Sequence, residues 1–244
     1  MRVPLIFASG HLLDGVPAGS GADEALAHAC RSLRQFAIAV DGVEEAFAAL
    51  VEASRVETAL SYEASKKVGP GEGFPLPADF GLRPRYWQER QLFHAKAGVI
   101  ALDQIREALL HVESVTKSDA ALDARHQLLA AFPDLNGLRD SVAHASSRAR
   151  WMTDARNRPP ISLALTADET ANGILWSDFV SSVGHVDGTT FTFRVVRNGH
   201  PAAGRLELTD GNITLAAELI QQLVDALPWK PIAPNVGPVR LRLG

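Results

Sequence analysis

The sequence contains a single cysteine, Cys30, and no long apolar run. One cysteine excludes an intrachain disulfide and any zinc site built from several cysteines. Because no run of about 18 or more apolar residues occurs, the sequence predicts no membrane-spanning helix. The apolar run near the start is broken by Ser9, Gly10 and His11, so it is too short and too polar for a secretory signal. We therefore expect a cytoplasmic protein in a reducing compartment.

The sequence also has fewer basic than acidic residues, and its formal net charge is -4. Non-specific binding to nucleic acid requires a positive surface, so the overall charge argues against a protein that coats nucleic acid. Residues 139–158 differ, since five arginines stand against two aspartates, a local balance of +3. Two interpretations stay open for these arginines. They form a phosphate-facing patch, or they complement the carbonyl end of a helix and remain solvated.

The first two thirds of the chain show helical periodicity. Apolar residues recur at three- and four-residue steps over residues 22–67, which predicts two helices meeting near Asp41 and Gly42. Residues 68–84 are dense in Gly and Pro, so they predict a loop. Its GPGEG stretch lacks the following G-K-[ST] and the preceding strand of a phosphate-binding loop, so we exclude that function.

Further helices follow this loop. Pro84 suits the first turn of a long helix over residues 85–115. Ser118 and Asp119 predict the cap of a shorter helix, 120–132, and Pro133 and Asp134 open the next one. We expect an up-and-down helical bundle. The longest apolar stripe is its predicted core: Leu92, Val99, Leu102, Ile105 and Leu109.

The C-terminal third changes to alternating, β-branched segments. These predict strands at residues 161–165, 174–183, 189–196 and 205–208, separated by turns at 172–173, 187–188, 198–199 and 210–211. Thr214 is the expected N-cap of a final helix, 215–227. The alternation of apolar and polar residues at 239–243 predicts an edge strand or a partner-binding arm. We therefore expect an α+β protein: a mainly helical up-and-down bundle, residues 1–157, followed by a small antiparallel β meander with one C-terminal helix, residues 158–244, packed on the bundle.

The most informative motif is Arg139, Asp140, Ser141, Val142, Ala143, His144, in which Arg and His are separated by four residues. This spacing resembles the signature of the HEPN superfamily of helical bundles, whose active members cut RNA. The family commonly has Asn where this chain has Asp140. The resemblance implies a homodimer in which two copies of the motif form one cleft, with Arg139 and His144 as catalytic residues.

The residue types suit metal-independent RNA cleavage. Histidine exchanges protons near neutral pH, and arginine holds phosphate oxygens through its fork. Arg139 and His144 are about 140° apart on an ideal helix, whereas Asp140 and His144 share a face, so Asp140 is a candidate to orient His144. The candidate phosphate or RNA contacts are Ser141, Arg148 and Arg150.

Structural interpretations of the same residues remain open. His144 can cap helix carbonyls, and Arg139 can pair with Asp134 or with a helix neighbour. Neither H-E-x-x-H nor G-x-S-x-G occurs, so we expect no metal, no cofactor and no serine hydrolase. Two functions follow as hypotheses. A non-catalytic interaction module is slightly favoured, and the alternative is an endoribonuclease of toxin or defence type. The expected partners are a second copy and RNA or a protein such as a cognate antitoxin.

Overall fold

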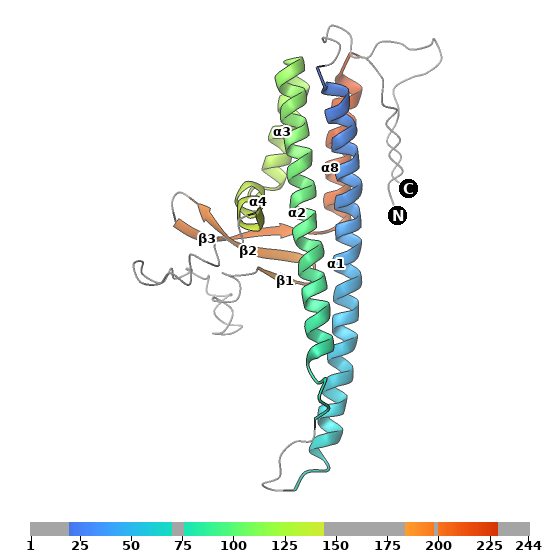
Figure 1. Ribbon diagram of the computed structural model, residues 1–244. Coiled ribbons are helices and arrows are strands. Elements are labelled where there is room, and N and C mark those ends of the chain that lie inside the picture. Colours follow the sequence, from blue (N-terminus) through green and yellow to red (C-terminus); the bar gives the residue numbers. More distant parts are fainter. Residues whose placement is uncertain (1–19, 70–75, 144–183, 198–199, 229–244) are drawn as a thin grey trace, which may run out of the picture.

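The computed structural model describes residues 20–69, 76–143, 184–197 and 200–228 (Figure 1). These residues form a predominantly helical structure with one small antiparallel sheet, which confirms the mainly helical α+β class. The helices are α1 (Ala22–Ser65), α2 (Leu82–Thr116), α3 (Asp119–Ala131), α4 (Leu135–Ala143) and α8 (Asp210–Ala226), and the strands are β1 (His185–Asp187), β2 (Thr190–Arg197) and β3 (His200–Glu207).

α1 is one continuous helix of 44 residues, so the prediction of two helices meeting near Asp41 and Gly42 was wrong. Gly42 is buried inside this helix, and the ring of His94 on α2 occupies the space that a Cβ at Gly42 would need. The glycine therefore serves close packing between α1 and α2. This tertiary contact outweighs the weak helix propensity of Asp and Gly.

α2 runs antiparallel to α1 and begins at Leu82, with Pro84 in its first turn as expected. The predicted core stripe is confirmed. Val99, Leu102, Ile105 and Leu109 are fully buried, and Leu92 is partly buried against the same core.

The short helices α3 and α4 lie close to their predicted positions. Ser118 is the N-cap residue of α3, but its side chain makes no capping hydrogen bond. At the start of α4, the Asp134 carboxylate accepts a hydrogen bond from the backbone N–H of Arg205 at 2.9 Å. This bond attaches the first turn of α4 to strand β3.

The three strands form a meander in the order β1-β2-β3, with both pairs antiparallel. Phe191, Phe193 and Val195 of β2 are buried, and Phe191 is paired with Leu206 of β3. The expected strand at 189–196 and the turn at Gly188 are confirmed. The strands expected at 161–165 and 174–183, the turns expected at 172–173 and 198–199, and the edge strand or arm at 239–243 lie outside the described residues.

α8 begins five residues earlier than expected. Thr209 adopts an extended conformation at the N-cap, and its side chain accepts a hydrogen bond from the Asn212 N–H. That bond satisfies one of the free N–H groups of the first turn. Asp210 and Gly211 are therefore the first turn of the helix, so the predictions of a turn at 210–211 and a cap at Thr214 were wrong.

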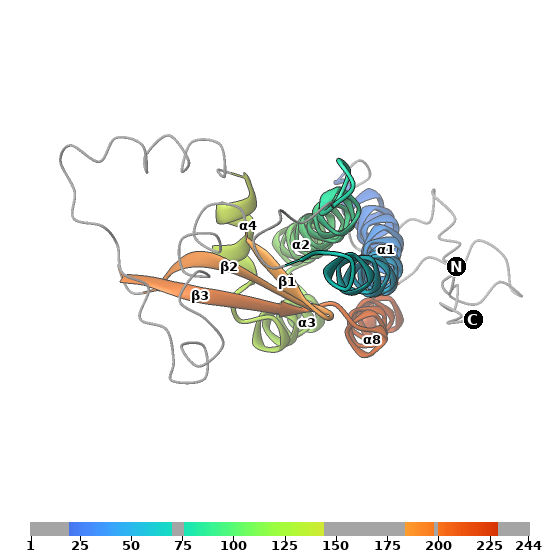
Figure 2. The same ribbon diagram turned by 90° about the horizontal axis from the view of Figure 1, so that it is seen from below.

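The sheet, the helices and α8 share one hydrophobic core, which includes Phe36, Leu102, Phe191 and Ile220. The sheet, α3 and α8 gather on one side of the α1–α2 pair (Figure 2). No helix in the described part of the chain is both long and apolar enough to cross a membrane.

Candidate functional site

Arg139 of α4 lies against α2 and is held by carboxylates. Its Nε atom is 3.5 Å from Oδ2 of Asp103, and its Nη1 atom is 3.2 Å from Oδ1 of the adjacent Asp140. The Nε atom is fully buried and makes no hydrogen bond within the described residues. Arg139 is thus engaged in ion pairs with one residue of α2 and with a helix neighbour, and Asp134 bonds to β3 instead.

The ion pairs around Arg139 extend into α2. Asp103, whose side chain is 15% exposed, also binds Arg106 at 2.8 Å, and Arg106 contacts Glu107 as well. Two arginines therefore share three carboxylates at the contact between α2 and α4. In such a cluster the neighbouring carboxylates compete with a phosphate for the guanidinium groups.

Asp140 and Ser141 of α4 differ in exposure. The Asp140 side chain is 51% exposed, whereas Ser141 is fully buried. In this conformation the Ser141 hydroxyl does not face solvent, which favours its interpretation as an internal hydrogen-bonding residue over a phosphate contact.

The remaining motif residues are outside the described part of the chain. α4 ends at Ala143, and His144, Arg148 and Arg150 follow it. The structure therefore places Arg139, Asp140 and Ser141 and leaves the pairing of Arg139 with His144 as a prediction.

Metal ligation has no candidate in the described residues. No group of three or more His, Cys, Asp or Glu side chains there is arranged to hold a metal ion. Among the histidines that the structure describes, His94 and His185 have a shifted pKa. Burial is the largest cause and lowers the pKa of both histidines. Arg90 lowers the pKa of His94 further, and Glu45 partly opposes this shift. Asp187 partly opposes the shift of His185.

A second feature was missed by the sequence patterns: a helical hairpin that extends away from the packed core. We call residues 47–69 and 76–90 the hairpin arm and the other described residues the base. No residue of the arm is buried, although it comprises the last five turns of α1 and the start of α2 (Figure 1). Its α1 portion, residues 47–65, is about 28 Å long.

The arm carries most of the exposed apolar side chains. Of the eleven large hydrophobic residues exposed in the described structure, eight lie in the arm: Phe47, Val51, Val56, Leu60, Tyr62, Leu76, Leu82 and Tyr86. The alternation of apolar and charged residues that predicted a helix here does not reveal that the base ends near residue 46. Only the positions of α3, α8 and the sheet determine which half of α1 is covered.

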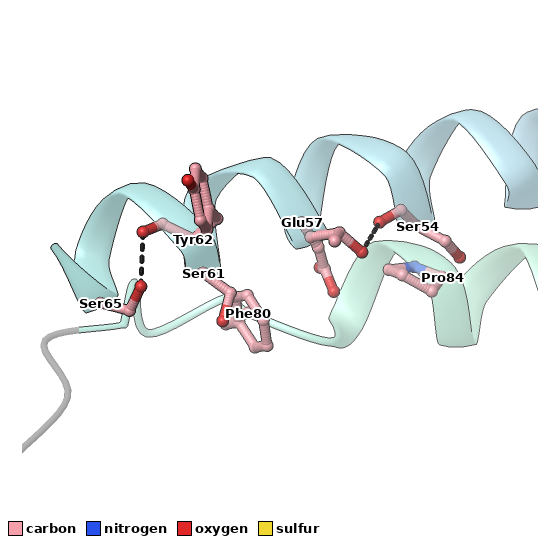
Figure 3. Close-up of a pocket in the computed structure, with 8 residues that line it drawn as sticks. Ser54, Glu57, Ser61, Tyr62, Ser65, Phe80 and Pro84 are labelled. Atoms are coloured by element: carbon pink, nitrogen blue, oxygen red, sulfur yellow. Dashed lines mark hydrogen bonds between the residues drawn. The ribbon is translucent and has the colours of Figure 1, made fainter.

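A hollow of about 610 Å³ lies at the arm tip, between α1 and the chain that leads into α2 (Figure 3). Its polar groups are largely engaged by the protein itself. The Thr58 hydroxyl donates to the Ser54 carbonyl, the Ser65 hydroxyl donates to the Tyr62 carbonyl, and the Glu57 carboxylate accepts from the Gly81 N–H. These bonds stabilise the tip, and the groups do not converge on a ligand.

Comparisons of the chain with protein-family models, curated protein sequences and solved structures returned no match.

Proposed function

We propose that this protein is a non-catalytic interaction module that binds a protein partner through its hairpin arm. The observation that carries this proposal is the concentration of exposed apolar side chains on an arm without buried residues. Exposed apolar surface in a folded protein is typical of interaction sites. A partner that covers the arm would remove this surface from water.

The ion pairs of Arg139 support the non-catalytic part of the proposal. An arginine that stabilises a phosphate in the transition state must be able to direct its donors at that phosphate. Here Asp103 and Asp140 both attract the guanidinium group. The spacing of Arg139 and His144, which resembles the HEPN signature, is what favours the alternative proposal of an endoribonuclease acting as a homodimer.

Site-specific photo-crosslinking tests the binding function. A photoreactive amino acid is introduced at Leu60 or Tyr86 of the arm, and at Leu110 of the base as a control with an exposed apolar side chain. We expect the two arm positions to give one discrete protein adduct in cells that express the chain, and Leu110 to give none. Equal labelling from all three positions, or none from the arm, would contradict a docking role.

A cleavage assay separates the two functions. Purified protein is incubated with single-stranded RNA in the presence of a metal chelator, and the products are resolved by electrophoresis. We expect the RNA to remain intact. Cleavage that disappears in both Arg139→Ala and His144→Ala would overturn the non-catalytic proposal and support the endoribonuclease.

A further inference from the structure

One side of the hairpin combines the exposed Val56 and the half-buried Trp87 with separated rows of opposite charge. On α1, Glu45, Glu52 and Val56 follow one another at steps of seven and four residues, so they share a side of the helix. On α2, Arg83, Trp87 and Arg90 follow at steps of four and three. We call these six residues the charged face.

Contacts at the junction with the base show that both rows lie on the same side of the hairpin. The His94 ring packs against Gly42 of α1, and both Arg90 and Glu45 act on its acidity. His94 continues the α2 row one turn beyond Arg90, and Gly42 lies one turn before Glu45. The acidic row of α1 and the basic row of α2 are therefore neighbours across the hairpin.

The two rows have the same spacing and the same height along the hairpin. Glu45 and Glu52 are seven residues apart, as are Arg83 and Arg90. The contact of Gly42 with His94 and the hydrogen bond of Gly81 to Glu57 fix the alignment of α1 and α2. At that alignment Glu45 is level with Arg90, and Glu52 is level with Arg83.

This pattern is self-complementary under one symmetry operation. A two-fold axis parallel to the hairpin keeps every residue at its height and places α1 of one copy opposite α2 of the other. Glu45 then faces Arg90 of the second copy, and Glu52 faces Arg83 of the second copy. A two-fold contact requires equal spacing of the two rows, whereas an unrelated partner does not.

The side chains of this face are available for such a contact. Among the ion pairs of the described residues, none includes Glu45, Arg83 or Arg90, and Glu52 pairs only with the exposed Arg55. The sheet, α3 and α8 gather on one side of the α1–α2 pair (Figure 2). Ile38, two turns before Glu45 on the same helix side, is exposed. The charged face is thus left uncovered by the described elements.

We propose that the partner of the arm is a second copy of this chain, bound through the charged face with α1 of each copy against α2 of the other. This inference rests on the proposed function of the arm. The charged face spans about 17 Å from Glu45 to Val56, so two helices side by side present roughly 350 Å² per copy there, or roughly 700 Å² in total, which is the size of a weak contact. We expect a weak dimer that dissociates in the micromolar range, and it differs from one formed through residues 135–150.

Charge exchange between two variants tests the arrangement. The acidic variant carries Arg83→Glu and Arg90→Glu, and the basic variant carries Glu45→Arg and Glu52→Arg. Like charges face each other in a dimer of either variant, so each is expected to dimerise at least about tenfold more weakly than the wild type. An equimolar mixture opposes acidic to basic rows at both contacts, so it is expected to recover dimers in sedimentation equilibrium.

Two valines of α1 provide a matched apolar control. Val56 belongs to the charged face, and Val51 lies about 140° round the same helix. Both are exposed residues of the arm. Val56→Lys is expected to weaken the dimer, and Val51→Lys is expected to leave it unchanged, with circular dichroism confirming equal helix content in all variants.

The outcomes separate this inference from the proposed function. A wild type that remains monomeric at about 200 μM, about a hundredfold above a low-micromolar dissociation constant, overturns the self-association. An equimolar mixture of the acidic and basic variants that stays monomeric also overturns the self-association. If the arm positions then crosslink to a different protein, the interaction module stands and only its partner was wrong. A monomer whose arm gives no adduct contradicts both.

Discussion

Arg139 shows at the residue scale how one side chain can satisfy a sequence motif and still have a structural role. Arg139→Ala removes the partner that joins Asp103 to α4 but leaves Asp103 paired with Arg106. We expect a loss of about 1 kcal/mol in the free energy of unfolding, because the pair is only partly buried. Urea denaturation checks this value, with Asp140→Ala as an exposed control expected to change it by less than about 0.5 kcal/mol.

A catalytic arginine would behave differently. Its replacement would abolish RNA cleavage and leave the denaturation midpoint unchanged, so that result would contradict the structural role of Arg139.

The lowered pKa values of His94 and His185 are expected to make stability depend on pH. The unfolded chain has a histidine pKa near 6.5 and binds protons more readily than the folded protein, in which burial favours neutral His94 and His185. Their contribution to stability is therefore fully present above pH of about 6.5 and is lost as the pH falls below that value through the folded-state pKa values.

Denaturant unfolding between pH 7.5 and 5.5 measures this dependence. We expect the free energy of unfolding to decrease across the window, and the decrease to be smaller in a variant with both His94→Asn and His185→Asn. An identical pH dependence in the double variant would show that other groups are responsible.

At the scale of elements, α4 contacts the sheet through two glycines. A Cβ at Gly137 of α4 would lie 2.9 Å from Cβ of Val195, and one at Gly204 of β3 would lie 2.5 Å from Cγ1 of Val195 on β2 and 3.2 Å from Cδ2 of Leu138 on α4. We expect Gly204→Ala to destabilise the fold by about 1–3 kcal/mol, because buried side chains would have to move.

Gly211→Ala is the control for that substitution. Its new Cβ would lie 3.7 Å from the Thr209 hydroxyl, an ordinary contact in the first turn of α8. This variant is expected to match the wild type or to gain up to about 1 kcal/mol, because alanine favours a helix. Equal destabilisation by both substitutions would mean that Gly204 is not closely packed by Val195 and Leu138.

Elements with strong local patterns were predictable from the sequence, whereas features set by distant contacts were not. The stripe from Val99 to Leu109 identified α2 and its core because hydrophobic periodicity and burial agree there. The sequence analysis placed a helix end at Gly42. Glycine is needed there because the ring of His94, 52 positions away in the sequence, occupies the space of a Cβ. The candidate site was predictable only as a pattern of residue types, since Asp103, the second partner of Arg139, belongs to another helix.

At the scale of the whole molecule, Cys30 reports on the integrity of the core. Burial raises the pKa of this thiol to about 11 from 9.0. The reactive thiolate is then roughly a hundredfold scarcer than in the unfolded chain, and the surrounding core also blocks access. We expect Cys30 to react with an aromatic disulfide reagent at least about a hundredfold more slowly in native buffer than in denaturant. Comparable rates would mean that the base opens readily.

The continuity of α1 has a consequence for hydrogen exchange. We expect backbone amides in the first half of the helix, beside the buried Leu33 and Phe36, to exchange only when the core unfolds, and amides of the arm to exchange by fraying from the tip. One unbroken helix therefore has two local stabilities, with the boundary near Ala46. Mass spectrometry should find strong protection before this boundary and a decline towards Ser65. A second copy bound along the arm would slow exchange there at high protein concentration. Hydrogen exchange along this one helix would therefore measure both the stability of the core and the self-association of the chain.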